Sequence, residues 1–249
     1  MSKRWLGMIA VMAVGSMLTG CNLVSDPAKL TAVQTQRTMD PLGLQSIETS
    51  LEGMNAIQTY SLKAAMQVAT GRFTREVDFY GSVQLPATIS MDETIGGSDY
   101  LVYQDGQFAY YKDENRWLPM QPLTNLKPWD SLLQLLQSSP PKVVYQLPKQ
   151  TVVSWNCNVY QFRDRARAGS GGLASSLPGD SVRTVPRDAL YTVYIDANDG
   201  QLRQIQVQST VGVPGLGTSS FTGTTLMFGY NVPVKLNVPD DLLAQIENP

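Results

Sequence analysis

The chain has 249 residues, of which 43% are hydrophobic and 16% charged, and its formal net charge is −2. This length fits one large β domain or two small ones, and the apolar share is ample for a core. The low charge and acidic balance argue against disorder and against nucleic-acid binding, which requires a basic face. The sequence contains no histidine, which excludes Ser-His-Asp and Cys-His catalysis and the usual histidine-containing zinc and haem sites.

Residues 1–20 have the features of an export signal. Lys3 and Arg4 precede an uncharged apolar stretch, 5–18, which is shorter than the roughly 20 residues of a membrane-spanning helix. The stretch ends in Leu-Thr-Gly-Cys at 18–21, which resembles the lipobox of bacterial lipoproteins. The resemblance implies that Cys21 is the lipid attachment site and the mature N-terminus. The alternative is an ordinary cleaved signal with an incidental cysteine.

A lipid anchor at Cys21 predicts an extracytoplasmic protein held at the cell membrane through a diacylglycerol and acyl group. Asn22, in place of an aspartate, resembles the sorting pattern for the outer membrane of a bacterium with two membranes. Residues 22–39 are polar without a sustained period, so 21–39 is expected to be a lipidated N-terminus and flexible tether.

Two amphipathic helices and a short third one are predicted after the tether. Asp40 and Pro41 are typical of an N-cap and a first helical position. The apolar residues that follow recur every three or four positions, at Leu44, Ile47, Leu51, Met54 and Ile57. A second stripe follows Pro128, at Trp129, Leu132, Leu133 and Leu136. The third helix is expected at 240–246.

The remaining pattern has a period of two, which predicts strands. Turn sequences such as Asp105-Gly106 and Asn198-Asp199-Gly200 favour hairpins between them. Strands are expected from Thr59 onward, at 73–80, 100–104, 107–112, 142–147, 151–162, 190–195, 202–209, 221–230 and 234–238. They predict an α+β fold with a single curved antiparallel sheet, a half-barrel, and two or three helices on its concave side. Such an arrangement leaves an apolar cleft between sheet and helices.

The order of these elements resembles the LolA/LolB-like (LppX/LprG-like) half-barrel superfamily of bacterial lipoproteins. The run Tyr-Thr-Val-Tyr-Ile-Asp-Ala-Asn-Asp-Gly-Gln-Leu at 191–202 is similar to a strand–turn–strand late in that domain. Phe-Gly-Tyr-Asn-Val-Pro-Val-Lys-Leu-Asn-Val-Pro at 228–239 resembles its closing segment. The resemblance covers 40–249 and implies a non-enzymatic carrier whose apolar cavity binds a lipid or an acylated protein.

The predicted cleft has two sides. Its wall on the sheet is expected to be Phe73, Val77, Phe79, Leu101 and Tyr103, and the helix residues Leu51, Met54, Leu132 and Leu136 are expected to face them. A second hypothesis fits the same pattern: a packed core without a ligand, in an envelope interaction or sensor protein. An apolar cavity open at one end favours the first hypothesis, and a filled concave face favours the second.

Residues 164–188 do not fit the pattern of strands. They are rich in Gly and Ser and predict a mobile insertion. Its arginines, at 165, 167, 183 and 187 with Arg163 just before, either meet anionic lipid headgroups or keep a solvated loop soluble.

No catalytic or metal site is predicted. The run from Asp196 to Gly200 suggests a calcium loop, but Gln201 and Val207 stand where such a loop needs glycine and glutamate, which favours a hairpin turn. Glu76 and Asp78 share one face of a strand and are expected to form its solvated side. Cys157 has no intrachain partner once Cys21 is acylated, and it is expected to be a small buried apolar residue.

Overall fold

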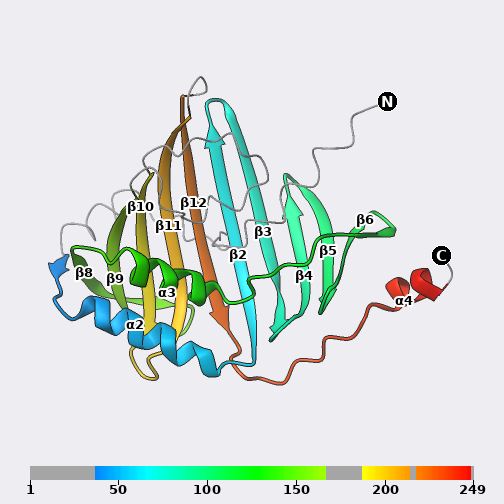
Figure 1. The fold of residues 1–249 in the computed structure, drawn as a ribbon, viewed down its shortest axis with the longest axis horizontal. Helices are drawn as coiled ribbons and strands as arrows, with labels where there is room; N and C mark the ends of the chain where they lie inside the picture. The colour runs from blue at the N-terminus through cyan, green and yellow to red at the C-terminus, as the bar shows by residue number, and fades with distance from the viewer. Residues whose placement is uncertain (1–36, 167–186, 214–216, 248–249) are drawn as a thin grey trace.

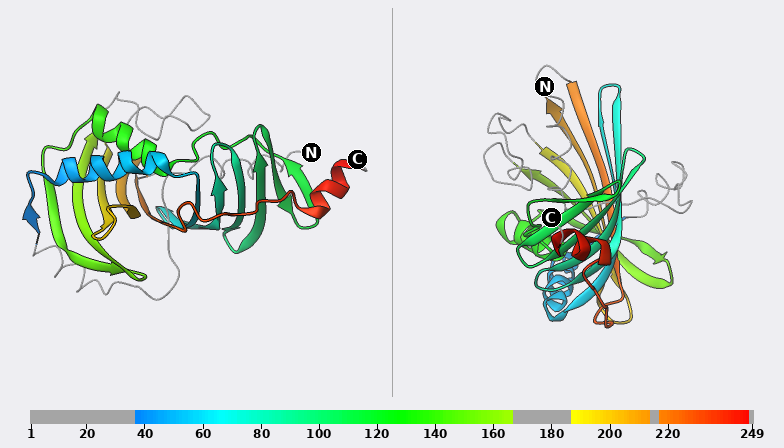
Figure 2. Two further views of the ribbon diagram at one scale, coloured as in Figure 1. Left: turned by 90° about the horizontal axis from the view of Figure 1, so that it is seen from below. Right: turned by 90° about the vertical axis from the view of Figure 1, so that its right-hand side faces the viewer.

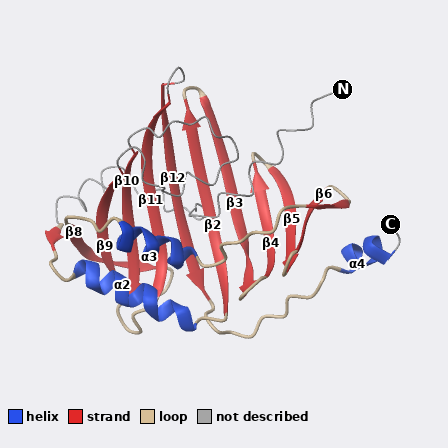
Figure 3. Ribbon diagram, in the orientation of Figure 1, coloured by secondary structure: helices blue, strands red, loops and turns tan. Residues whose placement is uncertain are grey.

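The computed structural model describes residues 37–166, 187–213 and 217–247, so the predicted signal segment and Cys21 lie outside the described residues. Figure 1 and Figure 3 show the arrangement of the elements. In chain order they are β1 (Thr38–Met39), α2 (Gly43–Gly53), the 3-10 turn η2 (Met54–Ala56), β2 (Thr59–Thr70), β3 (Phe73–Gln84), β4 (Thr88–Ile95), β5 (Ser98–Asp105), β6 (Phe108–Asp113), β7 (Arg116–Pro119), α3 (Pro128–Ser138), β8 (Val144–Val152), β9 (Trp155–Ala166), β10 (Arg187–Asp196), β11 (Leu202–Val213), β12 (Gly217–Phe228) and α4 (Asp240–Glu247).

In the described residues the twelve strands form one antiparallel sheet, in the order β1-β8-β9-β10-β11-β12-β2-β3-β4-β5-β6-β7. The pairing of β12 with β2 joins the end of the strand meander to its beginning, from Ser219 opposite Thr70 to Phe228 opposite Ser61. These central strands are long, with twelve residues each in β2, β3, β11 and β12. The predicted fold class, α+β with a single curved antiparallel sheet and helices on its concave side, is confirmed.

The sheet curls around α2 and α3, which lie side by side on its concave side (Figure 2). The third helix, α4, packs on the other side of the sheet. Its Leu242 contacts Tyr103 and Trp117. Tyr103 follows Val102 in β5, and Val102 belongs to the main core under α2 and α3. Because successive residues of a strand point to opposite faces, Tyr103 and α4 lie on the convex side.

Helix α2 begins at Gly43, two residues later than expected. Asp40 and Pro41 belong to a turn before the helix, in which the Asp40 carboxylate accepts a hydrogen bond from the Leu42 amide at 2.9 Å and the Asp40 carbonyl accepts one from Gly43. The aspartate therefore shapes the turn that leads into the helix and does not cap its first turn. None of the described helices is long and apolar enough to cross a membrane.

The expected strand at 234–238 is wrong. This stretch has no strand partner and runs as an extended connection beneath the sheet toward α4 (Figure 1). Pro233 and Pro239 bracket it, and proline has no backbone N–H to give to a strand ladder. Val238 instead packs against the cluster of Tyr103, Trp117 and Leu242.

The boundary between β8 and β9 also differs from the prediction. The hairpin turn falls at Val153 and Ser154, where Val153 has a positive φ of 56°. Pro148 stays within β8, and the register with β9 shifts between Leu147 and Gln150. A bulge of this kind accommodates a proline that cannot donate to the neighbouring strand.

The concave face as candidate functional site

Strand register determines which side chains share the concave face. In β2 and β3 the opposed pairs Ala64 with Phe79 and Met66 with Val77 point inward, and Gly223 of β12 continues the second row. All five residues are buried. On the convex side of β3, Glu76 is exposed and accepts a hydrogen bond from Gln67 at 2.8 Å, while Asp78 is half-buried. The expected division between an apolar and a polar face of β3 is therefore confirmed.

Helices α2 and α3 fill the part of the concave face that they cover. Six of the nine residues predicted for the cleft come together there in one buried cluster: Leu51, Met54, Val77, Phe79, Leu132 and Leu136. Leu51 and Leu136 have no exposed surface. Trp129 of α3 packs edge-on against Tyr60, with 5.2 Å between ring centroids, and the Tyr60 hydroxyl donates to the Leu126 carbonyl. The covered part is a packed core.

The loop that leads into α3 is pinned to the same face. The Gln104 side chain, 2% exposed, accepts a hydrogen bond from the Leu123 amide at 2.8 Å and donates to the Leu123 carbonyl at 3.1 Å. Because Gln104 belongs to β5, this bond pair fixes residues 120–127 across the concave side as the chain passes from β7 to α3 (Figure 1).

The far ends of the central strands extend beyond α2 and α3 (Figure 1). Phe73 and Val68 lie on the concave side by register, but Phe73 is 82% exposed and Val68 37% exposed. Phe221 of β12 lies opposite Val68 and is half-buried. We call Val68, Phe73 and Phe221 the uncovered patch. Phe73 was expected to face the helices, and the structure places it in this patch instead.

Leu101 and Tyr103 do not join the predicted cleft, because β5 has the opposite phase to the one expected. Its inward residues are Val102 and Gln104. Leu101 is 41% exposed on the convex side, and Tyr103 is buried there against α4. A strand with apolar residues at both even and odd positions does not reveal from its sequence which set faces the concave side. β5 has apolar residues in both sets, because α4 covers part of its convex side.

Glu93 is a carboxylate whose place on the concave face was not predicted from the sequence, where it stands only as one of a pair with Asp92. It lies opposite Phe79 of β3 and Tyr100 of β5 and is 2% exposed. Its Oε1 has no hydrogen-bond partner among the described residues. Burial raises the pKa of Glu93 to about 7, against the opposing effect of the Arg75 charge. The alternation of Ile89, Met91, Glu93 and Ile95 is the signal that would have placed it inward.

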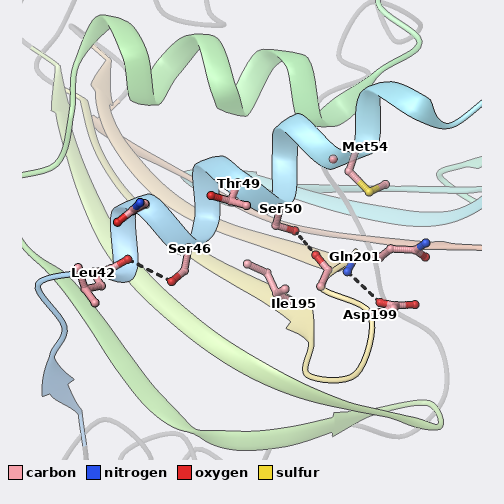
Figure 4. Close-up of a pocket in the computed structure, with 11 residues that line it drawn as sticks. Leu42, Ser46, Thr49, Ser50, Met54, Ile195, Asp199 and Gln201 are labelled. Carbon is pink, nitrogen blue, oxygen red and sulfur yellow. Dashed lines mark hydrogen bonds between the residues drawn. The ribbon is translucent and has the colours of Figure 1, made fainter.

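Two surface pockets flank the helices. The larger, about 530 Å³, lies between α2 and the β10–β11 turn (Figure 4). Its polar groups already serve the fold, since the Ser50 hydroxyl donates to the Gly200 carbonyl at 2.7 Å and the Asp199 carboxylate accepts from the Gln201 amide at 2.8 Å. The smaller, about 370 Å³, lies near Asn55, Leu85 and Lys127.

Part of the expected insertion at 164–188 belongs to the sheet, because β9 continues to Ala166 and β10 begins at Arg187. Arg163 is held by Asp188 at 2.9 Å on the convex side. The side chains of residues 165 and 187 and the whole of 167–186, with the other two arginines, lie outside the described residues.

Cys157 is buried and unpaired, as expected. Burial raises the pKa of its thiol to about 11, with the charge of Asp196 acting in the same direction. The thiol is therefore protonated at neutral pH and serves as an apolar core residue beside Val159 and Tyr194.

No protein-family model matches the chain. No curated protein matches it in sequence either. Among solved structures it is similar to LprF from Mycobacterium bovis, with a TM-score of 0.51 and 9% identity over 81% of this chain and 99% of that one. A LolA superfamily protein from Nitrosomonas europaea aligns over 80% of this chain and 96% of its own, with 8% identity and a TM-score of 0.28. The likeness to LprF shows that this chain shares the fold of that protein, which supports the single curved sheet with helices that the sequence predicted.

Proposed function

We propose that this protein is a cell-envelope lipoprotein, anchored through Cys21, whose uncovered patch binds the acyl chain of a lipid or of an acylated protein. Residues 1–20 are its signal peptide, 21–39 its tether and 40–249 its half-barrel domain in this proposal. The lipobox-like run Leu-Thr-Gly-Cys at 18–21 supports the envelope role, and the fold shared with LprF is the curved sheet that the resemblance to the LolA/LolB-like lipoproteins implies.

One observation carries the binding role: Phe73, Val68 and Phe221 form an apolar surface on the inner side of a curved sheet. An exposed phenylalanine on a concave face is a surface that a hydrocarbon chain can cover, at roughly 25 cal/mol for each Å² removed from water. The proposed binding surface therefore differs from the cleft predicted from the sequence, because the residues under α2 and α3 are already packed against one another. An acyl chain would lie beside the helices and not beneath them.

The packing under the helices also favours a second candidate function. Leu51, Trp129 and Leu136 are completely buried, so the covered part of the concave face is filled by side chains of the protein itself. A protein that binds no lipid and uses the uncovered patch for an envelope protein partner would have the same core. The two functions differ in whether a hydrocarbon chain binds.

The test compares two exposed aromatic residues of β3 that lie on opposite faces. Phe73 is on the concave side, and Tyr80, 54% exposed, is on the convex side. The full chain with Cys21→Ala, which removes the anchoring thiol, is titrated with a fluorescent fatty-acyl probe. Phe73→Ser is expected to weaken binding about tenfold or more, because burial of a phenylalanine side chain contributes about 1.5–3 kcal/mol.

Tyr80→Ser is the matched control and should leave the affinity unchanged. Organic extraction of the same protein followed by mass spectrometry should release a lipid in stoichiometric amount. Equal losses in the two variants, or repeated extraction without a lipid and no probe binding, would favour the protein-partner function.

A further inference from the structure

Glu93 is a carboxylate surrounded by apolar and aromatic side chains. Its neighbours along β4 on the concave face are Met91 and Ile95, and its partners across the sheet are Phe79 and Tyr100. Buried polar groups in proteins nearly always have a hydrogen-bond partner, and an unpaired one destabilises the folded state, more so when it is charged. Glu93 Oε1 has none in the part of the chain that the structure describes.

The position of Glu93 places it at the edge of the cover provided by α3 and its preceding loop. Phe79, opposite it, is 7% exposed and belongs to the packed core. Tyr100, directly across from Glu93 in β5, is half-buried, and so is Ile95, two residues further along β4 toward the β4–β5 turn. Beyond them on the same face of β3 are Arg75 and then Phe73, both exposed. The carboxyl group thus lies on the same face of the sheet as the uncovered patch, and because Glu93 is 2% exposed a ligand reaches it only by displacing the half-buried side chains of Ile95 and Tyr100.

The groups around Glu93 indicate which kind of ligand group it can bind. The charge that acts on it most is that of Arg75, which forms no ion pair with it in the structure. A phosphate or carboxylate would be repelled by the ionised carboxylate. A hydroxyl group can both donate and accept a hydrogen bond, so it satisfies a carboxylate and a neutral carboxyl group alike. With a pKa of about 7, Glu93 has both forms available near neutral pH.

We propose that Glu93 hydrogen-bonds the hydroxyl group of an acylglycerol-type lipid whose hydrocarbon chain lies on the uncovered patch of Val68, Phe73 and Phe221. This inference rests on the proposed acyl-chain binding and specifies its ligand class: a lipid with an uncharged, hydroxyl-bearing headgroup. Glu93 determines headgroup preference, while Phe73 contributes affinity for any chain.

Two probes with the same chain separate these contributions. 1-Monooleoylglycerol carries free hydroxyls, and methyl oleate carries none. Both are used as competitors against the fluorescent acyl probe on the full chain with Cys21→Ala. The unsubstituted Glu93 protein is expected to prefer monooleoylglycerol about tenfold, the effect of one buried hydrogen bond to a charged group.

Glu93→Leu should remove that preference and leave methyl oleate binding intact. Glu93→Gln, whose amide also donates and accepts, should retain part of it. Glu76→Leu replaces an exposed carboxylate on the convex side of β3 and should change neither affinity. Thermal melting of each variant establishes that it is folded.

Equal affinity for the two probes with Glu93 present, or an unchanged preference in Glu93→Leu, would overturn the assignment of Glu93 while leaving acyl binding intact. Absence of binding by either probe would contradict the proposed function itself. The two failures are therefore distinguishable in one data set.

Discussion

Arg203 illustrates how this protein accommodates a charge in its interior. It is 6% exposed, and its guanidinium contacts the carboxylates of Asp196 and Asp199 at 2.9 and 2.5 Å. The same group lies over the rings of Trp155 and Tyr230, 4.7 and 5.3 Å from their centroids. One arginine thus connects the β10–β11 turn to the start of β9 and to the residues after β12.

Arg203→Met is expected to lower the free energy of unfolding by about 3–5 kcal/mol, because it leaves Asp196 buried without its cation. The Asp196 pKa, which burial alone would raise, is lowered by hydrogen bonds from the Asn198 amide and Arg203, so the carboxylate is ionised at neutral pH. Urea unfolding measures the loss. Arg163→Met breaks an ion pair whose side chains are 52% and 42% exposed and should cost less than about 1 kcal/mol. Similar losses for both variants would contradict this account.

Glu93 gives the opposite pH response from Asp196. Its pKa is raised from 4.5 to about 7 in the folded protein, so between these values the folded state binds more protons than the unfolded one. Stability from this group is therefore complete below about pH 4.5 and is lost as the pH rises through 7. The loss amounts to roughly 3 kcal/mol, since one pKa unit corresponds to about 1.4 kcal/mol.

We expect Glu93→Gln to flatten the fall in unfolding free energy between pH 5 and pH 8, as measured by urea titration at several pH values. Glu76→Gln, at an exposed position, should preserve the slope of the unsubstituted protein. The lowered pKa of Asp196 acts only at acid pH, below this window. A slope that is the same in Glu93→Gln would show that another group produces it.

Two glycines show how the requirements of a strand differ from those of a helix. A Cβ at Gly81 of β3 would overlap the Ser90 carbonyl oxygen and the Met91 side chain of β4. A Cβ at Gly53, the last residue of α2, would meet nothing within 4 Å, and the φ of Gly53 is −59°. The first glycine permits the close approach of two strands, whereas the second only weakens a helix.

Gly81→Ala is expected to destabilise the protein by about 1–3 kcal/mol, because the obstructing atom is backbone and β4 must shift. Gly53→Ala should stabilise it by about 0.5–1 kcal/mol through helix propensity and a smaller loss of chain entropy. Chemical denaturation of both variants gives the two values, and two effects of the same sign would disprove the distinction.

At the scale of the whole molecule, the proposed anchor and the proposed binding patch are separate features that act independently. If Cys21 is acylated, the full-length protein should partition into the membrane fraction of the expressing bacterium. Cys21→Ala should release it, because one thioether-linked diacylglycerol and an N-terminal acyl group supply the hydrophobic attachment. Phe73→Ser should remain in the membrane fraction, since that change affects only the patch. Retention of Cys21→Ala with the membranes would contradict anchoring at this residue.

The periodicity of the sequence determined most of the elements by itself. Four of the apolar residues that recur at helical spacing are buried: Leu51, Met54, Leu132 and Leu136. An apolar stripe along one side of a helix is removed from water only when that side packs against the rest of the protein. Val77 and Phe79 are buried for the equivalent reason in a strand. The strand predicted at 234–238 was wrong because the apolar residues there alternate as in a strand, while the prolines that bracket the stretch have no backbone N–H to donate to a neighbouring strand.

The sequence also indicated one curved sheet with helices on its inner side. Alternating apolar residues predict that one face of each strand is buried, and the turn signals predict where the strand ends. Only the tertiary structure decided the phase of β5, since Leu101 and Tyr103 could face either side until α4 covered the convex one. It also decided how far α2 and α3 reach along the sheet, which leaves Phe73 exposed to water and leaves Oε1 of Glu93 without a hydrogen-bond partner among the residues that the structure describes. Local pattern records that a residue prefers burial, whereas the extent of the cover depends on where distant segments of the chain come to lie.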